Sequence, residues 1–400
     1  MIIFPPIHKL RGRLPIIRLR FLEQENSRFY FTFLLRNFAT GLVAIFEPIY
    51  YFEYFHKSIS SVLVLYALLF GSIGVLCYWT IKFTGRIGLK RSIILSFPAS
   101  LLYYFLLFNL DASPFLLIPT FIVWVAAILL FWMPVNIYFG IVANKTKLGR
   151  EVGTFNILMG LSLALGPLAG GIILANLGWP ALFLSVILLL LFTGIPLFFS
   201  PELHEYYTVS LNDVAKEIVK RSYLPKAFAF AANGAEFVIK GVIWPLFLFV
   251  LGIQFESIGI IAAGALLAGT VFTFGIGVLT DRISKHGLLA GGSLLLSFAW
   301  VVSVFVRTSF SAFLANLFYG MASAVAMVPF MAIFYKDFDA SRSHIIVLRE
   351  ITLGIGRAGI LLLFAILFLF THAFILTFLG AALLVPLFNL LTVGDRSRTS

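Results

Sequence analysis

Long apolar blocks separated by short polar breaks run along almost the whole chain. Each block holds roughly 18–27 residues, enough to cross about 30 Å of hydrocarbon as an α-helix. The blocks are apolar without alternation, which is typical of membrane helices rather than of the strands of a β-barrel. The pattern predicts twelve transmembrane helices, at residues 29–53, 60–81, 92–110, 115–142, 152–176, 180–199, 227–251, 257–279, 287–306, 309–333, 345–370 and 372–392.

One polar break is longer than the others and divides the blocks into two groups of six. We therefore predict an N-terminal bundle over residues 29–199, a linker over 200–226 and a C-terminal bundle over 227–392. A basic segment, 1–28, precedes them and a short tail, 393–400, follows. The linker carries a partial helical stripe formed by Leu211, Val214, Ile218 and Val219. This stripe fits either a helix that lies on the membrane surface or a solvated connector helix.

The two predicted bundles carry similar features in the same order, about 197 residues apart. Each half has a proline inside an apolar block, an arginine that follows its second block and an Arg-Glu pair that opens a later block. The matching residues are Pro48 and Pro245, Arg86 and Arg282, and Arg150-Glu151 and Arg349-Glu350. The repetition predicts two pseudo-symmetric halves, and such halves in a membrane protein usually enclose a site between them.

Composition and charge indicate a membrane protein and exclude a soluble domain. Apolar residues make up 61% of the chain and charged residues 12%, with a mean hydropathy of +1.03, whereas soluble domains carry about 25% charged residues. Of the 29 Lys and Arg residues, 24 fall on one face of the predicted topology, two on the other face and three inside helices. Because basic loops stay inside, both termini are predicted to lie in the cytoplasm, with the chain in the cell membrane.

The net charge of +12 is spread over short segments at that one face, where it sets topology and meets anionic lipid. A nucleic-acid partner is therefore not expected. The single cysteine, Cys77, lies in an apolar block and can form no intramolecular disulfide. The six histidines lack the spacing of metal ligands, and no phosphate-binding loop or Ser/His/Asp cluster occurs. We expect no enzyme activity, no metal and no cofactor.

Two loop sequences resemble a motif of the major facilitator superfamily. The copy after the eighth predicted helix is similar to the G-x-L-x-D-R core of that motif, whereas Gly85 replaces the aspartate in the copy after the second helix. The matching residues are Gly277, Asp281 and Arg282 in the later copy and Arg86 and Gly88 in the earlier one. The resemblance implies an all-α membrane fold of two six-helix bundles that works by alternating access.

The resemblance and the charge pattern together predict an ionic network at the cytoplasmic ends of the helices. Its predicted members are Arg150, Glu151, Asp281, Arg282, Arg349 and Glu350. Arginine can bond a carboxylate in a fork, so such pairs can lock helix ends in one state and release them in another. The alternative is a set of static charges that only anchors the topology.

The fifth predicted helix contains a second motif, formed by Gly166, Pro167, Gly170 and Gly171. It is similar to the G-P-x-x-G-G motif that the superfamily associates with exporters and antiporters. Glycines let another backbone approach closely, and an internal proline kinks the helix. The stretch therefore fits either a seal against leak in an exporter or ordinary packing of small residues.

Five charged residues inside predicted helices are the main candidates for a substrate or coupling site: Arg36, Glu47, Glu236, Lys240 and Arg357. Each would cost roughly 2.5–3.5 kcal/mol at the bilayer centre if it faced lipid, so we expect them to face protein or a cavity. For Arg36 and Arg357 the alternative is snorkelling to the cytoplasmic interface.

Glu236 and Lys240 are the pair best placed for proton coupling. They are four residues apart on one predicted helical face, with Asn233 about one turn away, and can pair. Separation of the pair by substrate would let Glu236 exchange a proton, whereas a permanently closed pair would only fix the helix.

Together these features predict a monomeric secondary transporter that moves a small molecule by alternating access. Proton-driven export is favoured by the motif in the fifth helix alone. Two alternatives stay open: an uptake carrier or facilitator of the same fold, and a transport-dead scaffold or sensor. The charges inside the helices distinguish the last of these, because a scaffold does not need them to converge on one cavity.

Overall fold

The computed structural model describes residues 25–143, 149–195, 210–218, 220–280, 283–336, 344–371 and 373–392, and in these ranges the chain is helical with no strand. The first half contains α1 (Glu25–Ala44), α2 (Glu47–Tyr54), α3 (Ile59–Ile87), α4 (Leu89–Phe108), α5 (Leu117–Ala143) and α6 (Gly149–Thr193). Helix α8 (Leu211–Ile218) lies in the linker. The second half contains α9 (Leu224–Val238), α10 (Trp244–Val250), α11 (Phe255–Thr280), α12 (Lys285–Ser303), α13 (Ser309–Lys336), α14 (His344–Phe370) and α15 (Phe374–Leu384).

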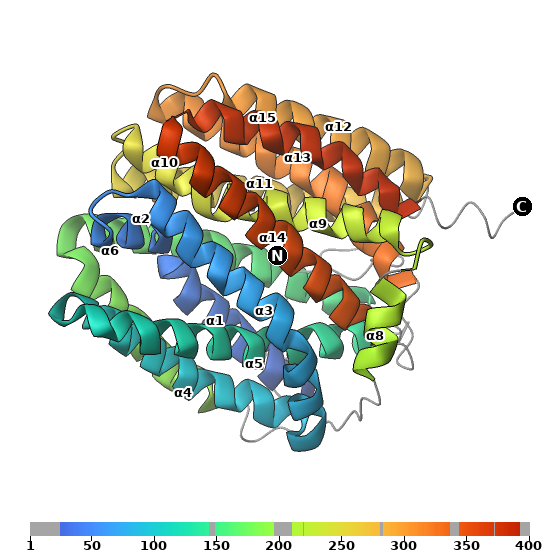
Figure 1. Ribbon diagram of the computed structural model, residues 1–400, viewed down its shortest axis with the longest axis horizontal. Helices are drawn as coiled ribbons and strands as arrows, with labels where there is room; N and C mark the ends of the chain where they lie inside the picture. Colours follow the sequence, from blue (N-terminus) through green and yellow to red (C-terminus); the bar gives the residue numbers. More distant parts are fainter. Residues whose placement is uncertain are drawn as a thin grey trace, which may run out of the picture.

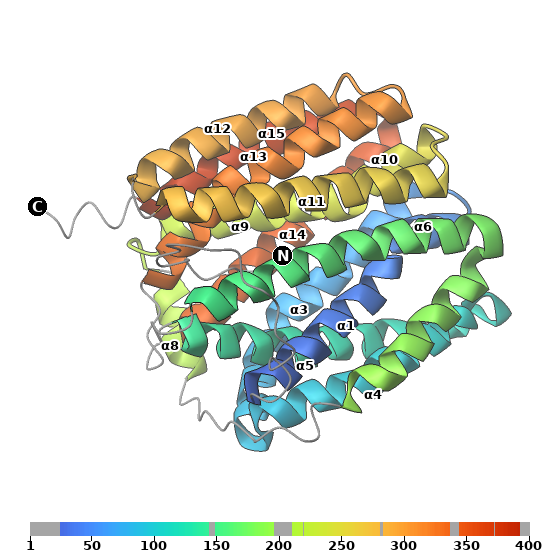
Figure 2. The ribbon, with the colours of Figure 1, turned by 180° about the vertical axis from the view of Figure 1, so that it is seen from behind.

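Eleven helical stretches of the described chain are long and apolar enough to cross a membrane. One of them, Met159–Thr193 in α6, has 35 residues, about 52 Å of helix at 1.5 Å per residue and too long for one crossing of about 30 Å. Gly178 interrupts it with φ 77° and ψ −177°, a conformation that glycine adopts readily. The chain folds back at this turn (Figure 2). The two parts of α6 are therefore two crossings, and the twelve predicted helices are confirmed.

The halves form two bundles that lie side by side, with helices coloured blue to green in one and yellow to red in the other (Figure 1). Two interfaces join them. Helix α3 packs against α14, and α6 packs against α11. Gly74 and Gly354 bring the first pair into close contact, since a Cβ at Gly354 would lie 2.8 Å from Gly74 Cα. Small residues thus set the distance between the bundles, as expected for helices packed in lipid.

The repeated prolines begin equivalent segments in the two halves. The first transmembrane helix is broken after α1, and Pro48 lies in the first turn of α2. The seventh passes through a π-helical turn at Ile239–Ile243 before Pro245 in the first turn of α10. Proline suits these positions because its missing N–H would have no partner at a helix start. Both breaks lie at mid-sequence of their helices, where they re-aim the flanking side chains.

Aromatic contacts between the halves close the end of the molecule at which α2 and α10 lie, on the left in Figure 1. The rings of Phe52 in α2 and Phe249 in α10 are 6.2 Å apart. Phe46, just before α2, meets Phe255 at the start of α11 with 6.1 Å between ring centroids. Helix α8 lies at the opposite end and packs against α14, with Val214 buried.

Candidate functional site

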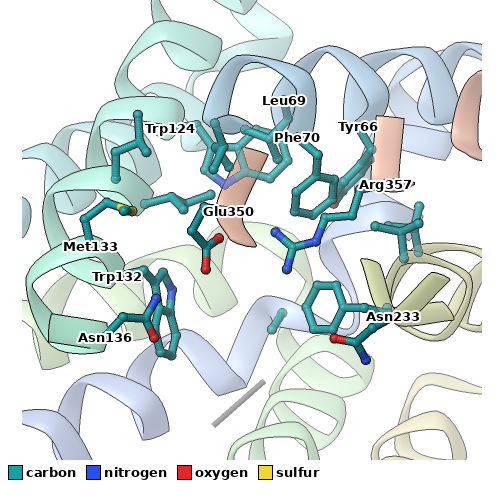
Figure 3. Close-up of a pocket in the computed structure, with 18 of the residues that line it drawn as sticks. Tyr66, Leu69, Phe70, Trp124, Trp132, Met133, Asn136, Asn233, Glu350 and Arg357 are labelled. Atoms are coloured by element: carbon teal, nitrogen blue, oxygen red, sulfur yellow. The ribbon is translucent and has the colours of Figure 1, made fainter. Parts of the chain in front are cut away.

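A cavity of about 330 Å³ lies between the two halves, at the lower end of the roughly 300–1,000 Å³ typical of small-molecule sites. Its walls come from α2, α3 and α5 of the first half and from α9, the π-helical turn and α14 of the second. Most of the lining is apolar or aromatic, including Tyr66, Phe70, Trp124, Trp132 and Phe237 (Figure 3). The polar lining residues are Glu47, Asn136, Asn233, Arg349, Glu350 and Arg357.

Glu47 contributes a buried carboxylate to the cavity wall. Its two oxygens accept hydrogen bonds from separate helices: Tyr103 of α4 donates to Oε1 at 2.6 Å, and Tyr66 of α3 donates to Oε2 at 3.3 Å. Trp124 of α5 stacks on Tyr103, with 5.3 Å between ring centroids, and meets Tyr66 edge-on at 5.2 Å. The hydroxyl donors, themselves held by packing, give the carboxylate a fixed position at the cavity.

Arg357 faces the same cavity from α14. Figure 3 shows its guanidinium group pointing into the open space, with Phe70 and Asn233 on either side of it. The guanidinium carbon lies 5.2 Å from the Phe70 ring centroid and 4.9 Å from that of Phe237. Within the described residues its Nε has no hydrogen-bond partner. Arg357 therefore faces the cavity rather than snorkelling, and two aromatic rings from opposite halves flank it.

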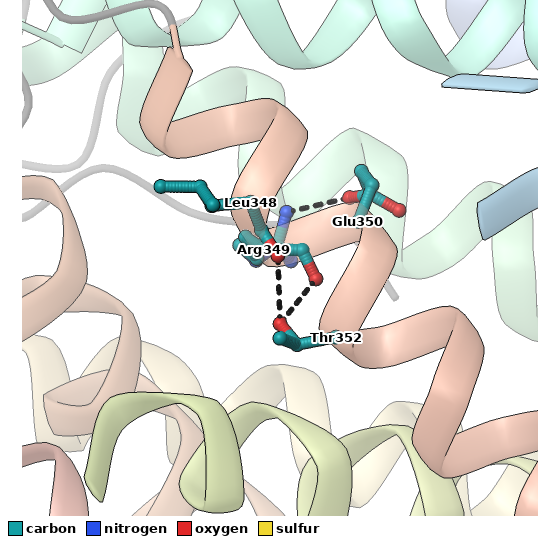
Figure 4. A network of polar contacts seen from close by, with 4 residues as sticks. All are labelled: Leu348, Arg349, Glu350 and Thr352. Carbon is teal, nitrogen blue, oxygen red and sulfur yellow. Dashed lines mark hydrogen bonds and ion pairs between the residues drawn. The ribbon is translucent and has the colours of Figure 1, made fainter. Parts of the chain in front are cut away.

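Arg349 and Glu350 also lie at the cavity, seven to eight residues before Arg357 on α14. Arg349 Nη1 donates to Glu350 Oε1 at 2.9 Å, and Thr352 Oγ1 donates to the carbonyls of Leu348 and Arg349 at 2.8 and 2.9 Å (Figure 4). Both charged side chains are buried. Both residues were predicted as members of an ionic network between helix ends. In the structure Arg349 pairs with its own neighbour, and Glu350 lies beyond the first turn of α14.

Glu236 and Lys240 lie inside the second bundle and are not among the residues that line the described cavity. Glu236 Oε1 accepts hydrogen bonds from Tyr319 at 2.6 Å and Trp300 at 3.1 Å. Lys240 instead donates to Asn316 Oδ1, and its ammonium lies 3.9 Å from the Tyr319 ring centroid. No ion pair within 4.0 Å joins Glu236 to Lys240 among the described side chains. The expected direct pair is therefore absent.

Of the other two candidates, Asn233 and Arg36, only the first lines the cavity. Asn233 lines the cavity, and its Nδ2 lies 3.5 Å from the sulfur of Met327. Arg36 does not line the cavity. It is buried in the first bundle, with its guanidinium carbon 3.4 Å from the centroid of the Phe131 ring. Packing over an aromatic face rather than snorkelling accommodates this charge.

A comparison of the sequence with models of known protein families identifies the family. A model described as Major Facilitator Superfamily matches residues 29–346. The chain belongs to this superfamily. Two solved structures share its fold, each with a TM-score of 0.64 and 14% identity. The human organic anion transporter MFSD10 matches over 92% of this chain and 99% of its own, and the E. coli fucose:proton symporter FucP over 94% and 98%. At this identity the likeness concerns the fold alone. A comparison with the sequences of curated proteins found no significant match.

Superfamily membership confirms the resemblance and the predicted fold. Members are transporters that move small molecules across membranes, and the chain is a multi-pass membrane protein with the architecture of such a transporter. A site between two bundles is where a transporter built from two repeats is expected to hold its substrate. The cavity between the halves therefore becomes the candidate site.

The superfamily motif in α6 lies where three helices meet. A Cβ at Gly170 would lie 1.9 Å from the carbonyl oxygen of Leu42 in α1, and one at Gly166 would lie 2.8 Å from the backbone of Gly41. On the side toward the other half, a Cβ at Gly171 would lie 2.6 Å from the carbonyl oxygen of Phe255 in α11. Pro167 packs against Gly259 of α11 as well. The motif therefore joins α1 to the interface between the bundles.

The structure describes only some members of the predicted ionic network. Asp281 and Arg282 lie outside the described residues, and so do the side chains of Arg150 and Glu151, whose backbone begins α6. In the earlier motif copy, Arg86 is exposed in the last turn of α3, and Gly88 ends that helix with φ 100°. Gly277 is buried in α11. The contacts between Arg349 and Glu350 are the part of the network that the structure describes.

The sequence reasoning missed the aromatic residues that hold the two carboxylates. These residues, Tyr66, Tyr103, Trp300 and Tyr319, lie within long apolar blocks, so no local pattern marks them. One signal was available. Tyr103 and Trp300 are separated by the same number of residues as Pro48 and Pro245, and each donates to the buried glutamate of its own half.

Proposed function

We propose that this chain is a secondary transporter that carries a small organic molecule through the central cavity by alternating access, coupled to protons and directed toward export. The observation that carries the proposal is the convergence of Glu47, Glu350, Arg349 and Arg357 on one cavity between the halves. A transport-dead scaffold has no need of charges gathered at such a place, because burying them in a membrane protein is costly.

Glu47 is the proposed proton-coupling group. It combines a titratable carboxyl with access to the cavity, so the same space can admit substrate and protons. The titratable groups bonded to it are the hydroxyls of Tyr66 and Tyr103, and Tyr51 in turn shares a hydrogen bond with Tyr103 at 3.3 Å. Glu236 was favoured on sequence grounds, but its burial away from the cavity supports a structural role instead.

The export direction is supported by the motif in α6, which packs tightly on both α1 and α11 as a seal in an exporter would. Uptake is the second candidate, because the fold is shared with a fucose:proton symporter. We further propose that the protein works as a monomer in the cell membrane with both termini in the cytoplasm, as the distribution of Lys and Arg supports.

The test is flux of a compound panel into proteoliposomes that contain the full-length protein. An acidic lumen drives accumulation if substrate and protons exchange, as export requires, whereas an acidic exterior drives it if they move together. We expect Glu47→Gln to abolish the effect of either gradient and Glu236→Gln to preserve it. Coupling through Glu47 is refuted if Glu47→Gln keeps the full response. If no compound moves under any gradient, the scaffold alternative stands.

A further inference from the structure

The charged groups at the cavity are unequally satisfied. Arg349 and Glu350 are bonded to each other, and Glu47 accepts two hydroxyl donors. Arg357 stands apart, since among the described residues it forms neither a hydrogen bond nor an ion pair. Glu350 lies about two turns away on the same helix, α14, but its carboxylate is bonded to Arg349. One arginine therefore faces the cavity with no hydrogen bond or ion pair within the described part of the chain.

A half-buried arginine that forms no hydrogen bond is costly inside a membrane protein, because a guanidinium group has five N–H donors and no acceptor of its own. Cation–π contact with Phe70 and Phe237 offsets part of that cost. Figure 3 shows the guanidinium group beside Phe70 and pointing into the open space of the cavity. An anionic group in the cavity would satisfy the guanidinium donors, and arginine binds carboxylates with two parallel hydrogen bonds.

The rest of the cavity indicates what such an anion carries. Trp124 and Trp132 line the cavity together with Phe70 and Phe237, so flat apolar surfaces border the space. Aromatic walls favour ring systems, because stacked and edge-on contacts add to the burial of apolar area. The volume of about 330 Å³ suits a small molecule rather than a peptide or a lipid with long chains.

We infer that the transported substrate is a small aromatic or otherwise flat organic anion, whose acidic group pairs with Arg357 between Phe70 and Phe237. The inference rests on the proposed transport function and names its substrate class. It assigns to Arg357 the role of anchoring the anion, while Glu47, on the other half, stays available for the proton. Because Phe70 and Phe237 belong to opposite halves, an anion held there contacts both bundles at once.

The test is binding of three naphthalene compounds to the purified full-length protein in lipid nanodiscs by titration calorimetry. The probes are 2-naphthoate, its neutral amide 2-naphthamide and the cation 2-naphthylmethylammonium. We expect naphthoate to bind at least about tenfold more tightly than the amide, as one or two charge-assisted hydrogen bonds predict. Arg357→Gln removes this preference and leaves amide binding within about twofold. Arg357→Lys, which keeps the charge, retains part of it.

Arg307→Gln is the matched control, because Arg307 bonds the carbonyls of Val304 and Val306 away from the cavity. The anion site is refuted if the amide or the cation binds as tightly as naphthoate, if none of the three binds, or if Arg357→Gln weakens acid and amide equally. Flux measurements separate the two proposals. If naphthoate binds through Arg357 but no compound is transported, the transport proposal is refuted and the anion site stands. If the cation is transported and Arg357→Gln leaves that flux unchanged, the anion site is refuted and the transport proposal stands.

Discussion

Each half of the molecule buries one glutamate under two aromatic donors, yet the two sites differ in their surroundings. In the first half, Glu47 accepts from two tyrosines and lies at the cavity. In the second half, Glu236 accepts from Tyr319 and Trp300 and lies within the bundle. The shared device is a carboxylate held by hydroxyl or indole donors from neighbouring helices. The difference is access to the space between the halves.

The neighbours of the two glutamates differ in charge as well. Lys240 lies one turn beyond Glu236 and donates to Asn316, which in turn donates to the carbonyl of Ile261 in α11 at 2.7 Å. Together with the bonds from Trp300 and Tyr319 to Glu236, these contacts join α9, α11, α12 and α13. Glu47 has no basic residue among its hydrogen-bonded partners in the described structure. The two halves therefore share one architecture, while the buried glutamate of the second half stabilises its bundle and that of the first half lies at the cavity.

The largest effect is expected from removing each carboxylate altogether. Glu236→Leu leaves the indole of Trp300, the hydroxyl of Tyr319 and the charge of Lys240 without their acceptor or counter-charge. Removing one partner of a buried charged network costs about 3–5 kcal/mol. Glu47→Leu strands two hydroxyls and no cation, so we expect a smaller loss of about 1–3 kcal/mol.

Thermal unfolding of both variants in the same detergent measures this difference, with Glu53→Leu as the control. Glu53 is exposed and accepts one bond from Trp179 at the surface, so its removal reports the cost of losing an exposed carboxylate. Equal destabilisation by Glu47→Leu and Glu236→Leu would contradict a bracing role confined to the second half.

A second effect tests whether the halves share their packing. A Cβ at Gly170 of α6 would lie 1.9 Å from the carbonyl oxygen of Leu42 in α1. A Cβ at Gly356 of α14 would lie 2.0 Å from the carbonyl oxygen of Ala231 in α9. Backbone atoms cannot move aside as a side chain can. We expect Gly170→Ala and Gly356→Ala each to cost about 1–3 kcal/mol or more through overpacking.

Gly359→Ala is the matched control for both glycines, since a Cβ there has open space around it on α14. The measurement is the yield of monodisperse protein and its thermal stability. If Gly170→Ala is tolerated and Gly356→Ala is not, close helix packing is not the role of the motif in α6. The two halves would then share their backbone fold but not the packing requirement at these glycines.

The sequence was sufficient for the architecture because hydrophobic length and loop charge are local properties. The separate blocks on either side of Gly178 predicted the turn that the structure contains within α6. Which residues line the cavity depends on how each helix is rotated about its axis, and residue spacing within one helix does not determine that rotation. Lys240 lies in the π-helical turn, where wider winding alters the usual i, i+4 alignment. Glu350 was expected in a network at the cytoplasmic start of its helix, whereas it lies in the second turn of α14 and lines the cavity.

The smallest effect is the most specific, because it removes one hydrogen bond from each glutamate and leaves both carboxylates in place. Tyr103→Phe deletes the 2.6 Å donor to Glu47, and Tyr319→Phe deletes the 2.6 Å donor to Glu236. Each loss is expected to cost about 0.5–1.5 kcal/mol, the net contribution of a single hydrogen bond to stability. Thermal stability therefore falls similarly in both, whereas the pH profile of transport changes in Tyr103→Phe alone, because only Glu47 is proposed to exchange protons with the cavity. A changed profile in Tyr319→Phe would place a proton step in the second half and return Glu236 to the coupling pathway.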